Sequence, residues 1–87
     1  MTQPRLATGA RLRYDDVREE HVLLVPEGAV RLNHTAAEVL ELCDGERSLE
    51  DIVGALSARY GGADLSEDVR GLLAAMTEKG LVVDAGA

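Results

Sequence analysis

The sequence predicts a single α+β domain in which a three-stranded antiparallel sheet is followed by three helices. Residues 11–33 alternate apolar and polar side chains in short segments, as half-buried strands do. Residues 35–79 instead place apolar side chains at helical spacing. The chain has 87 residues, which is enough for one domain and too few for two. Strands that precede helices in this way predict helices packed on one side of an antiparallel sheet.

Three short segments are predicted to be strands. Residues 11–14 alternate charged and apolar side chains, residues 21–25 form an apolar run, and residues 29–33 alternate again. Residues 15–20 are polar, and the sequence Pro-Glu-Gly at 26–28 is typical of a turn, because proline fixes φ and glycine permits positive φ. We therefore expect an antiparallel meander of these three strands.

Three helices are predicted from their start signals and their apolar stripes. Thr35 with Glu38 three residues later predicts a capping box at the first helix. Ser48 and Ser66 are expected to open the second and third helices, and glycines follow the end of each helix. The stripes are Ala36, Val39, Leu40 and Cys43 in the first helix; Leu49, Ile52, Val53, Leu56 and Tyr60 in the second; and Val69, Leu72, Leu73 and Met76 in the third.

The two ends of the chain flank this predicted domain. Residues 1–10 show no periodicity and are expected to form a flexible arm, which leaves residues 11–87 as one domain. Residues 81–83 form a short apolar tail that could pack back on the sheet or form a wing strand. The sequence leaves these two alternatives open.

The charge balance argues against nucleic acid and anionic membrane partners. Nine basic residues stand against sixteen acidic ones, a net charge of −7, whereas phosphate backbones are bound by clustered lysine and arginine. No apolar run approaches the roughly 20 residues of a membrane span. The first residues also lack the apolar core of a signal peptide. We therefore expect a cytoplasmic protein.

The residue types that carry catalysis or bind metals are few. Cys43 lies at the end of a predicted helix beside Asp44, where the helix dipole and the carboxylate disfavour a thiolate, so we expect a buried core cysteine. His21 and His34 show no metal-ligand spacing. The paired carboxylates fall in turns or first helical turns, and no phosphate-binding loop or nucleophile elbow occurs. The sequence predicts a binding domain with no catalytic, metal or cofactor site.

An open sheet edge is the remaining candidate for a binding site. A meander has two edges, and an exposed edge can accept an extended peptide as an additional strand. A helix stripe beside that edge would supply pockets for the side chains of the guest. The alternative, in which every stripe only fills the core, stays open at this point.

Four segments in fixed order resemble one known family. RLRYDDVREEHVLLVPEG, LNHTAAEVLELCDGERSLEDIV, ALSARYG and DVRGLLAAMTEKGLV together resemble the pyrroloquinoline quinone (PQQ) biosynthesis protein D (PqqD) family. The resemblance implies a winged helix-turn-helix-like fold that binds peptide in place of DNA. It also implies a peptide chaperone that binds the precursor peptide PqqA and presents it to the radical S-adenosylmethionine (SAM) enzyme PqqE. The cofactors of the reaction would belong to that enzyme.

The resemblance also implies where a peptide would bind. The guest is expected to add a strand beside residues 29–33, in a groove shared with the helix at 68–79. The expected contacts are backbone pairing with Val30, Arg31 and Leu32, and an apolar wall of Val69, Leu72, Leu73 and Met76. The N-terminal arm varies in such domains and can swap between protomers, so a homodimer is possible.

A winged-helix domain that binds nucleic acid or regulates transcription is the alternative function. It would share the fold but would need a basic third helix. Glu67, Asp68 and Glu78 outnumber Arg70 and Lys79 in and around that helix, which disfavours this alternative.

Overall fold

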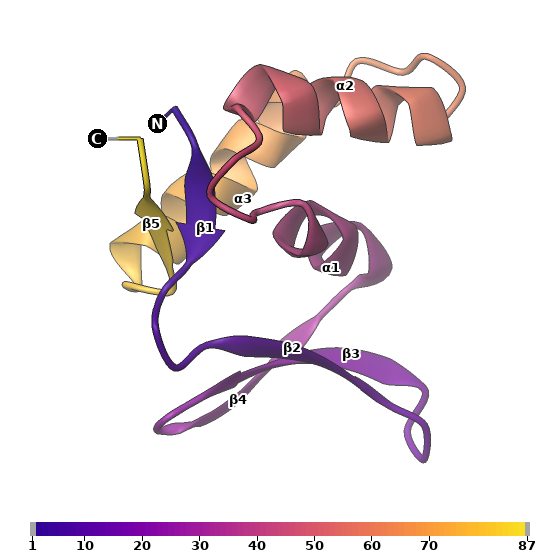
Figure 1. The fold of residues 1–87 in the computed structure, drawn as a ribbon. Coiled ribbons are helices and arrows are strands. Elements are labelled where there is room, and N and C mark those ends of the chain that lie inside the picture. The colour runs from indigo at the N-terminus through magenta and orange to yellow at the C-terminus, as the bar shows by residue number, and fades with distance from the viewer. Residues whose placement is uncertain (1, 87) are drawn as a thin grey trace.

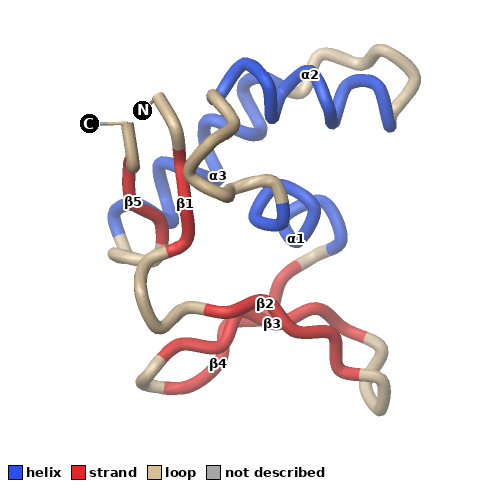
Figure 2. The backbone as a smooth tube through the Cα atoms, in the orientation of Figure 1, coloured by secondary structure: helices blue, strands red, loops and turns tan. Residues whose placement is uncertain are grey.

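The structure, a computed structural model, describes residues 2–86. Figures 1 and 2 show a three-stranded sheet on one side of the molecule, with the helices packed over it and a second, two-stranded pair beside the helices. The elements are β1 (Pro4–Leu6), β2 (Arg11–Asp15), β3 (Glu20–Val25), β4 (Gly28–Leu32), α1 (His34–Glu41), α2 (Leu49–Arg59), α3 (Ser66–Glu78) and β5 (Val82–Asp84). The predicted α+β order of three sheet strands followed by three helices is confirmed.

The three-stranded sheet is the predicted meander, with the strand order β2-β3-β4. Leu12, Leu23 and Val30 lie opposite one another across the three strands, and they face the helices. Leu23 on the central strand has no exposed surface. Among residues 2–86 neither β2 nor β4 has a second strand partner, so both edges of this sheet lack a neighbouring strand.

The first ten residues differ from the loose arm that the sequence predicts. Pro4–Leu6 forms β1, which pairs antiparallel with β5, so that these two strands from opposite parts of the sequence lie side by side (Figure 1). The carboxylate of Asp84 accepts hydrogen bonds from the backbone N–H groups of Thr2 and Gln3, at 2.9 and 3.0 Å. A strand of three residues is too short to show periodicity, and its partner lies at the opposite end of the sequence. The apolar tail thus forms a strand, paired to β1.

The helix starts follow the predicted signals at α2 and depart from them at α1. At α2 the Ser48 hydroxyl accepts from the N–H of Asp51, and the Asp51 carboxylate accepts from the N–H of Ser48. At α1 the cap is Asn33, whose side-chain oxygen accepts from the N–H of Ala36 at 2.7 Å. The predicted Thr35–Glu38 capping box is therefore wrong, because the cap lies two residues earlier, at Asn33, and Thr35 lies inside the first turn of the helix.

One hydrophobic core joins all the elements. In Figure 1, α1 lies between the sheet and α2, and it contacts all three sheet strands as well as α2. The buried apolar residues are Leu23, Leu32, Ala36, Ala37, Val39, Leu40, Leu42, Cys43, Leu49, Ile52, Leu56, Val69, Leu73, Met76 and Val82. Each predicted helical stripe contributes to this set. Within residues 2–86 no helix combines the length and apolar character needed to cross a membrane.

Candidate peptide-binding groove

A groove lies between the first turns of α1 and α3. Its volume is about 300 Å³. Its sides are mostly apolar, and small residues of α1 leave room between the two helices. The lining residues are Asn33, Thr35, Ala36, Val39, Leu65, Asp68, Val69 and Leu72. This is the size and character of a site that receives one or two side chains of a guest.

The groove begins where β4 ends. Leu32 is the last residue of β4 and Asn33 caps α1, so a single step of the chain leads from the strand to the groove. Since β4 pairs only with β3 among residues 2–86, its other edge remains available for an additional strand.

The predicted site residues of β4 fall on two faces of the strand. Val30 is half-buried and Leu32 is buried, and both pack toward the core. Arg31 is exposed on the opposite face, where its Nε lies 3.6 Å from a carboxylate oxygen of Glu20. Only the backbone of this strand, and not its apolar side chains, is therefore open to a guest.

The predicted residues of α3 divide into two pairs. Val69 and Leu72 line the groove, and Leu72 is half-buried. Met76 is buried in the core, while Leu73 is buried on another side of α3, where a second hollow also includes Leu49. The structure therefore brings Val69 and Leu72 together in the groove against α1, next to Asn33, and leaves Leu73 and Met76 outside it; Val30, Arg31 and Leu32 of β4 do not line this groove.

Sequence reasoning missed most of the α1 side of the groove. It assigned Ala36 and Val39 to the core stripe of α1, and both are indeed buried, but they also form part of the groove. Leu65 just before the third helix was an available signal, because an apolar residue at a helix entrance often packs against the neighbouring elements. Asp68 adds one carboxylate to the lining.

A polar cluster fixes the end of α2 against α1 near the groove. The Glu38 carboxylate accepts hydrogen bonds from the Tyr60 hydroxyl and, at 3.0 Å, from the Arg59 guanidinium. Nε2 of His34 lies 3.2 Å from the same carboxylate. The hydrogen bonds from Tyr60 and Arg59 hold the pKa of Glu38 below its usual value, and the bond to Glu38 raises the pKa of Tyr60. This cluster positions the start of the loop at residues 61–64, which connects α2 to Leu65 in the groove.

The family described as Coenzyme PQQ synthesis protein D (PqqD) matches residues 20–82. The chain belongs to the PqqD family. The match begins at β3 and ends at β5, so it includes β4, α1 and α3, the elements that form the groove.

Individual relatives agree with this assignment. The chain is 42% identical over 77 residues to the PqqA binding protein of Azotobacter vinelandii, covering 87% of this chain and 84% of the relative. It is 38% identical over 72 residues to the PqqA binding protein of Methylococcus capsulatus, covering 83% and 77%.

A solved structure shares the fold. It is the solution NMR structure of the PqqD truncation of Methylobacterium extorquens PqqCD, described as a functional, stand-alone recognition element for ribosomally synthesized and post-translationally modified peptides. The TM-score is 0.79 at 36% identity, over 92% of this chain and 87% of the other. The α+β arrangement of this PqqD-family chain is therefore that of a known peptide recognition element.

The sequence offers one candidate nucleophile, Cys43. Cys43 is buried, and its thiol donates to the carbonyl oxygen of Val39 at 3.3 Å. Burial, with a smaller contribution from the neighbouring Asp44 charge, raises the pKa of Cys43 to about 12, so the thiol stays protonated at neutral pH. This agrees with the predicted core cysteine. Among residues 2–86, histidine, cysteine and carboxylate side chains do not gather into a group able to hold a metal ion.

Proposed function

We propose that this chain is a peptide chaperone of PQQ biosynthesis that binds the precursor peptide PqqA beside β4 and presents it to the radical SAM enzyme PqqE. The observation that carries the proposal is the continuity between the unpaired edge of β4 and the apolar groove at Asn33. The relatives named as PqqA binding proteins and the likeness to a recognition element support the identity of the peptide.

Strand addition would supply most of the binding through the backbone. Val25 and Gly28 pair across the two-residue turn between β3 and β4. In such hairpins the closing pair is hydrogen-bonded, and the bonds then alternate along the ladder. By this alternation Val30 bonds to β3, whereas the N–H and C=O groups of Ala29 and Arg31 point to the free edge. We expect these two residues to pair with the guest.

The groove would supply side-chain selectivity. Val69 and Leu72 form an apolar surface on α3, and Asp68 adds a negative charge at the same place. A guest strand that places an apolar residue against Leu72 and a basic one near Asp68 would satisfy both. The chemistry performed on the peptide would belong to the enzyme that receives it, and the chaperone would contribute binding and orientation.

The nucleic-acid alternative is disfavoured by the charge on α3. Glu67 and Asp68 lie in its first turn, and Asp68 borders the groove. A helix that enters a DNA groove presents basic side chains to the phosphates, because counterion release dominates the affinity of proteins for DNA. The acidic first turn of α3 would instead repel the phosphates.

Calorimetric titration of the domain with synthetic PqqA tests the proposal. We expect Arg31→Pro to abolish binding, because proline removes the N–H offered to the guest. Arg31→Ala is the matched control, and it should bind like the wild type because it keeps the backbone donor. Circular dichroism establishes that both variants are folded.

Two results would contradict the proposed binding mode. The first is a folded Arg31→Pro domain that binds PqqA with wild-type affinity. If Arg31→Pro unfolds the domain, Ala29→Pro is tested in its place, because it removes the other outward N–H. The second contradicting result is then a folded Ala29→Pro domain that binds PqqA with wild-type affinity. Absence of any PqqA binding by the wild-type domain would reject the function itself.

A further inference from the structure

The face of the sheet that points away from the helices has a distinct composition. Cross-strand pairing places Arg11 beside Leu24 and Ala29 in one row, and Arg13 beside Val22 and Arg31 in the next. Arg18, from the turn between β2 and β3, also borders this surface. We call these residues the outer sheet face. A hollow of about 600 Å³ lies over most of it.

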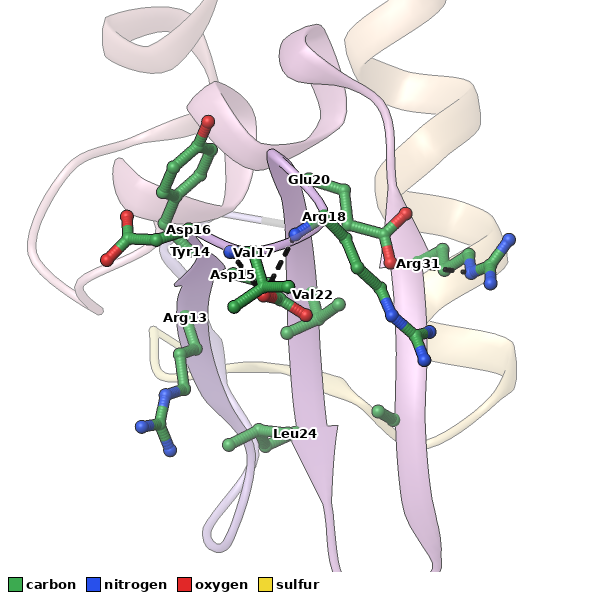
Figure 3. A pocket seen from close by; sticks show the side chains of 11 residues that line it. Arg13, Tyr14, Asp15, Asp16, Val17, Arg18, Glu20, Val22, Leu24 and Arg31 are labelled. Carbon is green, nitrogen blue, oxygen red and sulfur yellow. Dashed lines mark hydrogen bonds and ion pairs between the residues drawn. The ribbon is translucent and has the colours of Figure 1, made fainter.

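Figure 3 shows how these side chains are arranged. Val22 and Leu24 form an apolar strip along the central strand. Arg13 projects on one side of the strip, and Arg18 and Arg31 lie on the other side. The arrangement is an apolar floor with guanidinium groups on both sides, and the carboxylates of Asp15, Asp16 and Glu20 line the same hollow near the turn.

Most of these arginines have no acidic partner within the chain. In the part of the chain that the structure describes, Arg11, Arg13 and Arg18 make no ion pair, whereas Arg31 pairs with Glu20. The hairpin turn also exposes Val17, of which 93% is accessible. Arginine and apolar side chains that remain accessible on one surface are typical of a protein interface.

We propose that the outer sheet face docks an acidic segment, with one or two apolar side chains, on the enzyme that receives the peptide. This inference rests on the proposed function and assigns the surface through which delivery takes place. The apolar side chains of the partner would cover Val22 and Leu24, and its carboxylates would pair with the arginines on either side. Arginine suits this role because its planar guanidinium binds carboxylates in a bidentate manner.

The local acids favour a compact protein segment over a polyanion. Asp15, Asp16, Glu19 and Glu20 surround the turn at one end of the face. A nucleic acid or an anionic bilayer would bring phosphates against these carboxylates as well as against the arginines. The side chain of Arg18 extends from the turn along the sheet (Figure 3), so a short acidic segment can pair with the arginines and end before it reaches the carboxylates at the turn.

The location of this face suits delivery, because β4 would serve both partners. Its free backbone edge would hold the peptide, while its exposed side chains, Ala29 and Arg31, belong to the outer sheet face. The peptide and the enzyme would therefore bind next to each other and at the same time.

Charge reversal tests this assignment. The Arg13→Glu/Arg18→Glu double variant should bind purified PqqE at least about tenfold more weakly than wild type, with the loss larger at low salt. Its affinity for PqqA, measured separately, should stay unchanged, because neither residue lies in the groove. Arg70→Glu/Lys79→Glu, which changes the net charge equally on α3, is the control and should bind PqqE like wild type. The milder Arg13→Gln/Arg18→Gln variant should give an intermediate loss.

The outcomes separate this inference from the proposed function. If both double variants of Arg13 and Arg18 bind PqqE with wild-type affinity, the docking face is overturned and peptide delivery is left intact. Equal loss in the α3 control also overturns it, because net charge and not this face would then govern binding. If wild type binds PqqA but not PqqE, the delivery function fails and the inference fails with it.

Discussion

The helical part of the chain and the three-stranded sheet contribute differently to the molecule. Residues 1–32 hold five bases and five acids, whereas residues 33–87 hold four bases and eleven acids and so carry the whole net charge of −7. The helices also supply most of the buried residues, while β2, β3 and β4 supply only Leu23 and Leu32. The comparison teaches that stability resides mainly in the helices and that the sheet is free to present its edge and its outer face.

The largest expected effect tests where the stability lies. Leu56→Ala in α2 removes a side chain with no exposed surface and should lower the free energy of unfolding by about 2–5 kcal/mol, because it leaves a cavity. Leu24→Ala on the outer sheet face is the matched control and should cost less than about 1 kcal/mol. Urea denaturation measures both. Equal losses would show that the sheet is as important to stability as the helices.

The next prediction divides α3 between core and groove. Leu72→Ala should weaken PqqA binding by roughly tenfold, about 1.4 kcal/mol, because it removes apolar surface from the groove. Leu73→Ala should instead destabilise the fold and leave the affinity of the folded domain unchanged, since Leu73 is buried outside the groove. Titration calorimetry below the melting temperature measures both affinities. The reverse pattern would place the peptide on the other side of α3.

Cys43 tests whether the helical core contains any chemistry. Cys43→Ala should lower the free energy of unfolding by about 1–2 kcal/mol, as a small buried truncation does, and should leave peptide binding nearly intact. In the folded protein the thiol should react slowly with iodoacetamide at pH 8, because burial raises its pKa to about 12, and quickly in urea. Loss of function without loss of stability would mean that the thiol has a role beyond packing.

The smallest expected effect concerns the pairing of the two chain ends. Hydrogen bonds from the N–H groups of Gln3 and Thr2 lower the pKa of Asp84 below its usual value. A group whose pKa is depressed by folding stabilises the fold above its unfolded pKa, near 3.9, and this contribution is lost as pH falls further. Asp84→Asn should therefore lower the urea midpoint at pH 7 and lower it by a smaller amount at pH 2.5, where part of this contribution has been lost.

The control for this pH experiment lies in the hairpin turn between β2 and β3. Asp16→Asn changes the charge by the same amount, at a residue that is exposed. Its urea midpoint should match wild type at both pH values. A difference between Asp84→Asn and wild type that grew toward low pH would contradict the role given to the Asp84 carboxylate.

Local patterns determined most of the secondary structure from the sequence alone. The strands at 11–15, 20–25 and 28–32 match the predicted alternation to within one or two residues at each end, because successive side chains of a strand face opposite sides. The helical stripes were predicted because residues three and four positions apart share one face of a helix, and the cap at Ser48 depends on residues three positions apart. The cap at α1 was missed because Asn33 and Thr35 are both good capping residues, and packing selected the first.

Only the tertiary structure decided the rest, because it depends on residues that are distant in the sequence. No local signal shows that Pro4–Leu6 pairs with Val82–Asp84, since neither strand is long enough to have a pattern. The stripe of α3 was predicted as one apolar wall, but Val69 and Leu72 line the groove shared with α1, whereas Leu73 and Met76 are buried outside it. The outer sheet face likewise exists only through strand register, which places arginines from two strands and a turn around one apolar strip.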